Sequence, residues 1–116
     1  MTTDPDCLFC KIAAGQIPAD VIASSEGALA FRDINPKAPT HVLVIPTGHV
    51  ASLAEVPDDG GAMLAELVAL ANRVASDEGV GGGYRVVTNI GPDAGQSVGH
   101  LHLHVLGGRP MAWPPG

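Results

Sequence analysis

The sequence has few basic residues, few cysteines and no long hydrophobic segment, and each shortage argues against a class of protein. Six Lys and Arg stand against twelve Asp and Glu, giving a formal net charge of −6. Binding to a nucleic-acid backbone depends mostly on clustered basic side chains, so this charge disfavours nucleic acid as a partner. No apolar run approaches the roughly 18 residues of a membrane-spanning helix. The start, MTTDPD, is acidic where a signal peptide is basic, so we expect a cytoplasmic protein without a membrane partner.

The chain has 116 residues, of which 46% are apolar and 16% charged, as in one soluble globular domain. No internal repeat, linker or low-complexity block divides it, and we expect a single domain over residues 1–116. The two cysteines form the pair Cys7-Leu-Phe-Cys10. A pair so close in sequence is a poor disulfide staple, and in a cytoplasmic chain it indicates a metal or redox site.

The hydrophobic pattern predicts an α+β fold with a mainly antiparallel five-stranded sheet, one short N-terminal helix and one long helix. The short helix is expected in CLFCKIAAG, with Gly15 as its stop. Three strands are expected in DVIASSE (20–26), ALAFRDI (28–34) and HVLVIP (41–46). Two more are expected in YRVVTNI (84–90) and VGHLHLHVL (98–106), separated by the glycine-rich loop GPDAGQS.

The long helix is expected from about Pro57 to Glu78. Pro57 suits a first helical turn, and Gly79 suits the position after the last turn. Apolar residues recur between them at the i, i+3, i+4, i+7 spacing of one buried stripe. The predicted stripe consists of Leu64, Leu67, Val68, Ala71 and Val74.

Three of the five histidines stand at alternate positions in GHLHLHVLGG, as His100, His102 and His104. Alternate side chains of a strand share a face, so the three imidazoles are predicted to line one face. A solvent-facing row formed by accident would more often carry Lys, Glu or Thr. The opposite, buried face is expected to hold Leu101, Leu103 and Val105.

A metal ion and a nucleophile are the two interpretations of this row. Neighbouring imidazoles stand about 6–7 Å apart at Cα and the outer two about 13 Å, so one ion held by all three is disfavoured. Neutral imidazole attacks phosphorus without a separate base, and its protonated product leaves well in a second step. The preceding loop offers backbone N–H groups and the Ser97 hydroxyl to phosphate oxygens. These features favour a nucleophilic histidine.

The pattern His-φ-His-φ-His-φ-φ, where φ is hydrophobic, resembles the signature of the histidine triad (HIT) superfamily. The segments FRDINPKAPTHVLVIPTGH, TNIGPDAGQSVGHLHLHVLGG and MAWPPG are similar to its nucleotide-binding (Hint) branch, and the likeness runs from about Cys7 to Gly116. It implies a HIT-like fold and a purine nucleoside phosphoramidase, which cleaves a P–N bond on a nucleoside 5′-monophosphate. It implies no cofactor for catalysis.

The resemblance also assigns catalytic roles by position. His102 is the implied nucleophile, which forms a nucleotidyl-histidine intermediate. His104 would hold the α-phosphate, and His100 would orient the His102 ring through the local backbone. His41 corresponds to the family's fourth histidine, and Ser97 is a candidate to assist the leaving amine.

Substrate contacts follow from the same resemblance. The residues of the implied phosphate loop are Asn89, Gly95, Gln96 and Ser97. The implied ribose contacts are Asp33 and Ile34, and the implied base pocket consists of Phe9, Ile12, Ile17, Phe31 and Leu43. Without the resemblance, Asp33 reads as a turn former and the five apolar residues read as ordinary core.

Some members of the superfamily carry a structural zinc ion, and the corresponding residues here are Cys7, Cys10, His49 and His100. Two other interpretations of the cysteine pair are a thioredoxin-like dithiol and two reduced cysteines packed in an apolar helix. The dithiol is disfavoured because six residues before Cys7 leave almost no room for the strand it requires. The resemblance further implies a homodimer joined through the long helix and a neighbouring strand, with Trp113 near the other subunit's pocket.

The sequence leaves alternatives to a phosphoramidase, one of which its predicted structure disfavours. GQSVG (95–99) matches the G-x-S-x-G elbow of α/β-hydrolases, but a helix must follow that serine and the sequence predicts a strand. A dinucleoside polyphosphate hydrolase or a nucleotidyl transferase would use the same triad. A nucleotide-binding or interaction module with incidental activity stays open as well.

Overall fold

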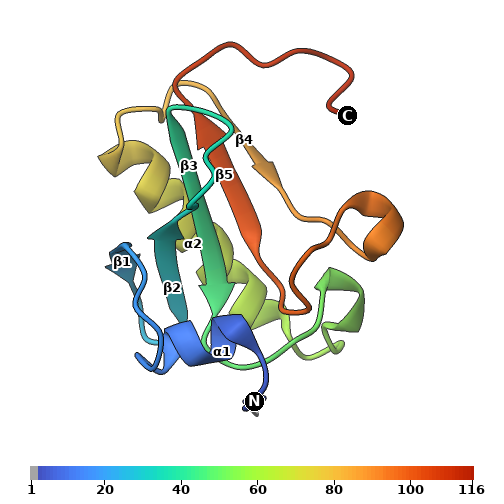
Figure 1. The fold of residues 1–116 in the computed structure, drawn as a ribbon. Coiled ribbons are helices and arrows are strands. Elements are labelled where there is room, and N and C mark those ends of the chain that lie inside the picture. Colours follow the sequence, from blue (N-terminus) through green and yellow to red (C-terminus); the bar gives the residue numbers. More distant parts are fainter. Residues whose placement is uncertain (1–2) are drawn as a thin grey trace.

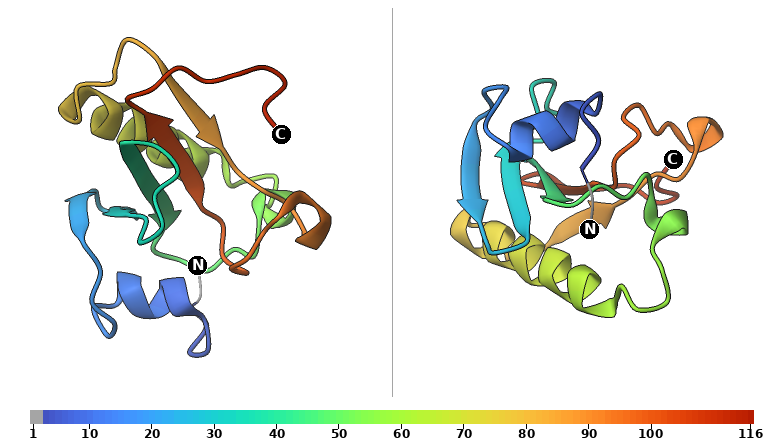
Figure 2. Two further views of the ribbon diagram at one scale, coloured as in Figure 1. Left: turned by 45° about the horizontal axis from the view of Figure 1, so that its top comes forward. Right: turned by 90° about the horizontal axis from the view of Figure 1, so that it is seen from below.

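A five-stranded antiparallel sheet lies between two helices in the computed structural model, which describes residues 3–116 (Figures 1 and 2). The strand order is β1-β2-β3-β5-β4, and this architecture confirms the predicted α+β fold. Among the described residues, none of the helices has the length and apolar character that crossing a membrane requires. The strands are β1 (Val21–Ser24), β2 (Ala28–Arg32), β3 (Thr40–Pro46), β4 (Tyr84–Val87) and β5 (Leu103–Gly107). The helices are α1 (Leu8–Ala13), η1 (Leu53–Glu55), α2 (Gly61–Asp77) and η2 (Pro92–Ala94).

The central strand β3 is buried along its whole length. Val42 and Val44 face the core under α2, whereas Leu43 and Ile45 face a second core under α1. A strand that is covered on both faces reads as a continuous apolar run, and this explains the sequence HVLVIP.

Helix α2 begins at Gly61, so the prediction that Pro57 occupies its first turn is wrong. Pro57 instead opens a tight turn, in which the Gly60 N–H donates to the Pro57 carbonyl at 2.9 Å. Two consecutive glycines delay helix formation here, because glycine is a poor helix former. The buried stripe also differs from the prediction, since Val68 is 52% exposed and Leu64 is only partly buried. The observed stripe is Leu67, Leu70, Ala71, Val74 and Ala75.

Strand β5 begins at Leu103 rather than at Val98. The first paired residues of β5 are Leu103, opposite Val44 of β3, and His104, opposite Val87 at the end of β4. Strand β3 itself continues to Pro46, where it pairs with β2 alone. The preceding residues bond elsewhere, for example through the Leu101 N–H, which donates to the Val50 carbonyl at 2.6 Å. The predicted alternation survives this change, and the α2-side core contains Leu101, Leu103 and Val105.

Candidate active site

A cavity of about 630 Å³ opens on the α1 side of the sheet. Directly opposite residues of antiparallel strands share a face, and the pairs Phe31–Leu43 and Leu43–His104 form one row across three strands. An apolar floor therefore leads directly to a triad histidine. The apolar lining includes the five predicted base-pocket residues Phe9, Ile12, Ile17, Phe31 and Leu43. The predicted site residues Asp33, Ile34, Ser97, His102 and His104 line the same cavity.

The His102 ring is held in one tautomer by the backbone. Its Nδ1 lies 2.7 Å from the carbonyl oxygen of His100, and a carbonyl only accepts, so Nδ1 carries the hydrogen. The neutral ring is thus left with an unprotonated Nε2. His102 is 4% exposed but lines the cavity, so the ring that carries this unprotonated nitrogen borders the cavity.

His104 is oriented by a chain of hydrogen bonds that starts at a backbone amide. The Lys37 N–H donates to Nδ1 of His41 at 3.0 Å, so the hydrogen of a neutral His41 ring is on Nε2. This Nε2 lies 2.9 Å from Nδ1 of His104 and donates to it. Nε2 of His104 consequently carries a hydrogen and is a donor.

Burial favours the neutral form of both His41 and His104, the two imidazoles of this hydrogen-bond chain. Burial, with the neighbouring His102 and His41, lowers the pKa of His104 to about 4 against the opposing effect of the Asp33 carboxylate. The pKa of His41 is also lowered, again mainly by burial, although Asp33 Oδ2 lies 3.5 Å from its Nε2. The neutral His104 ring therefore offers its Nε2–H as a donor, beside the Nε2 acceptor of the Nδ1–H tautomer of His102.

Three residues of the predicted phosphate loop do not line this cavity. Gln96 holds the loop in shape instead, because its Oε1 accepts from the Gly91 N–H and its Nε2 donates to the Ala51 carbonyl at 2.7 Å. Gly95 has a left-handed backbone, with φ 89°, at the end of η2. Trp113, which is predicted near the other subunit's pocket, is 83% exposed and does not line the cavity of its own chain. The predicted residues outside the cavity are Asn89, Gly95, Gln96 and Trp113 together with His41 and His100.

Sequence reasoning missed several residues of the cavity wall. Leu8 is one turn before Ile12 on α1, and this i, i+4 spacing was a signal that both lie on the same face. No comparable signal marks Asp20, which directly precedes β1 and lines the cavity. Arg32, whose place between Phe31 and Asp33 in the sequence indicates the pocket edge, lines the cavity from the end of β2. Arg32 is already engaged in a two-pronged ion pair with Glu78.

A smaller hollow of about 380 Å³ adjoins the histidines and shares Asp33, Ser97 and His104 with the main cavity. His41 and Lys37 also line it. Ser97 and His104 thus line both the main cavity and the smaller hollow.

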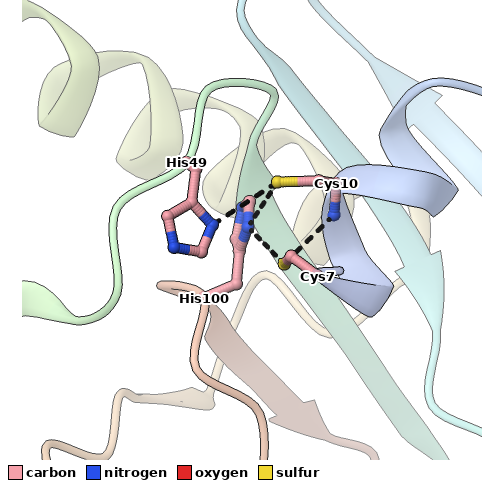
Figure 3. Close-up of side chains that lie close together, drawn as sticks. All are labelled: Cys7, Cys10, His49 and His100. Carbon is pink, nitrogen blue, oxygen red and sulfur yellow. Dashed lines mark hydrogen bonds between the residues drawn. The ribbon is translucent and has the colours of Figure 1, made fainter. Parts of the chain in front are cut away.

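Four side chains from distant parts of the chain converge beside α1 (Figure 3). Nδ1 of His100 lies 3.3 Å from Cys7 Sγ and 3.5 Å from Cys10 Sγ, and Nδ1 of His49 lies 3.4 Å from Cys10 Sγ. Sulfur and nitrogen ligands of one tetrahedral zinc ion stand about 3.5 Å apart. We call these four residues the Cys/His cluster.

The tautomer of His100 also fits a metal ligand. Its Nε2 donates to the Pro46 carbonyl at 2.9 Å, so the lone pair is on Nδ1, the atom nearest the two sulfurs. A ligating histidine is ordinarily fixed by such a second hydrogen bond. Burial lowers the pKa of His100 and raises that of Cys10. Of the residues before Cys7, the structure describes 3–6, which contain a turn and no strand, and this argues against the thioredoxin-like alternative.

The HIT domain family matches residues 14–111. The chain belongs to the HIT family. A 14 kDa zinc-binding protein of Zea mays is 48% identical over 115 residues, which cover 97% of this chain and 90% of the maize protein. The crystal structure of a HIT family hydrolase from Legionella pneumophila has a TM-score of 0.93 at 52% identity, over 96% of this chain and 100% of that one. A histidine triad nucleotide-binding protein from Candida albicans has a TM-score of 0.80 at 32% identity, over 94% and 83%. These matches confirm the HIT-like fold.

Proposed function

We propose that this HIT protein is a cytoplasmic nucleotide hydrolase of the Hint type, which cleaves the P–N bond of purine nucleoside 5′-phosphoramidates. The observation that carries the proposal is the bond from His102 Nδ1 to the His100 carbonyl, 2.7 Å long. It leaves Nε2 of a cavity-lining ring free for attack on phosphorus. The Legionella and Candida relatives, a hydrolase and a nucleotide-binding protein by name, support the same class.

The cavity suits a nucleotide from end to end. A purine is placed over the apolar floor of Phe31 and Leu43, which leads toward the histidines. The Asp33 carboxylate accepts from the 2′- and 3′-hydroxyls of the ribose. The α-phosphate meets the Nε2–H of His104 and the Ser97 hydroxyl, so neutral donors supply the attraction that the acidic chain as a whole lacks. The resulting partners are purine nucleoside monophosphates and their phosphoramidates.

In the first step Nε2 of His102 attacks phosphorus and the P–N bond breaks. Its electron pair stays on the amine nitrogen, which takes a proton from the Ser97 hydroxyl and leaves as a neutral amine. The nucleotidyl-imidazolium carries a positive charge, and the His100 carbonyl stabilises it through the Nδ1–H. Water then attacks phosphorus, the P–Nε2 bond breaks, and the proton lost by the water restores Ser97.

A second candidate is a hydrolase or transferase that acts on an anionic leaving group, such as that of a dinucleoside polyphosphate. The observation in its favour is Lys37, the basic residue that lines the smaller hollow next to His104 and Ser97. A binding module with incidental activity would instead bind AMP tightly without turning over any of these substrates.

We propose a structural zinc ion in the Cys/His cluster. Two sulfur and two nitrogen donors are a common zinc set, and the N···S distances are those of a tetrahedral site. The maize relative, named for zinc binding, supports this assignment. When bound, zinc would supply structural rigidity, and the two histidines that act on phosphate, His102 and His104, lie outside the set. Catalysis then requires no cofactor.

We also propose a homodimer. Val68 on α2 is exposed, and so is Val86 on the edge strand β4. Val86 pairs with Val105, which faces the α2 side of the sheet, so both exposed valines lie on one side of the molecule. Trp113 projects from the tail and is held near β4 through the Arg85 side chain, which donates to the Ala112 carbonyl at 2.8 Å.

The test is a comparison of kcat/KM for an AMP-amine, an AMP-anhydride and a dinucleoside polyphosphate. We expect kcat/KM for the phosphoramidate to exceed that for the other two substrates at least about tenfold, which corresponds to roughly 1.4 kcal/mol in the activation free energy. A dinucleoside polyphosphate as the best substrate would favour the second candidate. Tight AMP binding without turnover of any substrate would favour the binding module.

A further inference from the structure

Helix α1 belongs to both the Cys/His cluster and the nucleotide cavity. Cys7 caps its N-terminus and Cys10 lies in its first turn, and both are cluster members. Phe9 stands between them and lines the cavity. Its ring packs edge-on against His102, with the ring centroids 5.2 Å apart at 89°. A single turn of helix thus carries two metal-ligand candidates and a side chain that touches the proposed nucleophile.

The hydrogen bond to the His102 ring also comes from a residue of the Cys/His cluster. His100 faces Cys7 and Cys10 with its ring, and its backbone carbonyl accepts from Nδ1 of His102. The Phe9 ring also contacts His100, at 5.9 Å between centroids. The Phe9 ring and the His100 carbonyl, which both contact the His102 ring, therefore come from the cluster or from between its members. His104, outside the cluster, makes a further edge-on contact with His102, at 5.0 Å between ring centroids.

An anchor is needed here because α1 has only six residues. A helix of this length is not stable on its own in water, since helix nucleation is costly. Its N-terminal cap is a single sulfur acceptor, with the Cys10 N–H 3.4 Å from Cys7 Sγ. His49 and His100 lie beyond β3 and before β5, so joining them to the cysteines ties α1 to the middle of the sheet.

We propose that metal binding by the Cys/His cluster positions the nucleophile, with Phe9 as the positioning residue through which α1 acts on His102. The proposal rests on the zinc site proposed above. In the metal-loaded protein α1 is clamped, and the Phe9 ring and the His100 carbonyl together hold His102 in the Nδ1–H tautomer. In the metal-free protein α1 becomes more mobile. The His102 ring is then no longer held in one tautomer, and the cavity wall that α1 forms becomes mobile as well.

The experiment follows the His102 imidazole by ¹⁵N NMR in zinc-loaded and chelated protein, without any substrate. We expect a protected Nδ1–H signal in the loaded protein, and its loss on chelation. Exchange of the α1 amide hydrogens should become at least about tenfold faster at the same time. The amide spectrum of the sheet serves as the folding control, and zinc content is measured in parallel.

Three variants separate the effect of metal binding on α1 from general unfolding. Phe9→Leu keeps both cysteines, so it should bind one zinc ion yet show the unprotected His102 signal of the metal-free protein. Lys11→Ala, a change on the same helix outside both sites, is the matched control and should behave like the wild type. Cys10→Ser should lose zinc and the protected signal together.

The outcomes distinguish this coupling from the proposals on which it rests. Stoichiometric zinc with a His102 signal that chelation leaves unchanged overturns the coupling and leaves the zinc site standing. A protein that takes up no zinc overturns both. A failure of the hydrolase proposal would show only in the turnover assays, because the NMR measurement requires none.

Discussion

Replacing His41 with phenylalanine tests the hydrogen-bond chain that makes His104 a donor. His41→Phe keeps a ring of similar size but removes the donor 2.9 Å from His104 Nδ1, as well as the acceptor of the Lys37 N–H. The Nδ1 of His104 would then be buried without a partner or would take the hydrogen itself and donate toward Asp33. In either case the Nε2–H that faces the phosphate is weakened or lost.

The size of this effect follows from the cost of one unsatisfied buried polar atom. That cost is about 1–3 kcal/mol, so kcat/KM for an adenosine phosphoramidate should fall roughly 5- to 150-fold. His41→Gln offers a side-chain N–H in the same region and should recover part of the loss. A folded His41→Phe protein with kcat/KM within twofold of the wild type would refute the assigned direction of the chain.

Three further predictions follow from the site. Ser97→Ala should lower kcat more than it raises KM, because the hydroxyl acts on the leaving amine; an unchanged kcat removes Ser97 from the mechanism. Burial lowers the pKa of His104 from an ordinary 6.5 to about 4, so the unfolded chain binds the proton more readily and stability is lost as pH falls from about 6.5 toward 4. The loss is on the order of 3 kcal/mol, and urea unfolding of His104→Gln should show a smaller dependence over that range. Cys10→Ser should abolish stoichiometric zinc in protein purified without added metal, as measured by elemental analysis; full zinc content in this variant contradicts the assigned ligands.

The three-histidine row could be predicted from the sequence because alternation is a local property of an extended chain. His100 and His102 keep it even though β5 begins only at Leu103. The late start of β5 could not be predicted, since it depends on where β4 ends and on the Leu101 N–H, which bonds to the Val50 carbonyl and not to a strand partner. The stripe of α2 was ambiguous for a related reason. Val68 and Leu70 are both apolar, so the sequence does not show which of them faces the core. Only the packing of α2 against the sheet decides that Leu70 is buried and Val68 exposed.

The Cys/His cluster could be predicted only in part from sequence spacing. Spacing alone joins Cys7 to Cys10, but nothing local brings His49 and His100 to the same place. The fold does so, because β3 and β5 are antiparallel neighbours and the residues after one lie beside those before the other. Gln96 shows the same dependence, since an amide suits a phosphate or a backbone equally and only the structure places it on the Ala51 carbonyl.

The covalent intermediate on His102 is tested most directly by a rapid acid-free quench of a phosphoramidate reaction, followed by mass spectrometry of the digested protein. We expect an acid-labile nucleotidyl group on His102, formed and lost at rates that match turnover, and absent from His102→Asn. Undiminished turnover by His102→Asn, or steady turnover with no modified His102 at any time, would contradict this expectation.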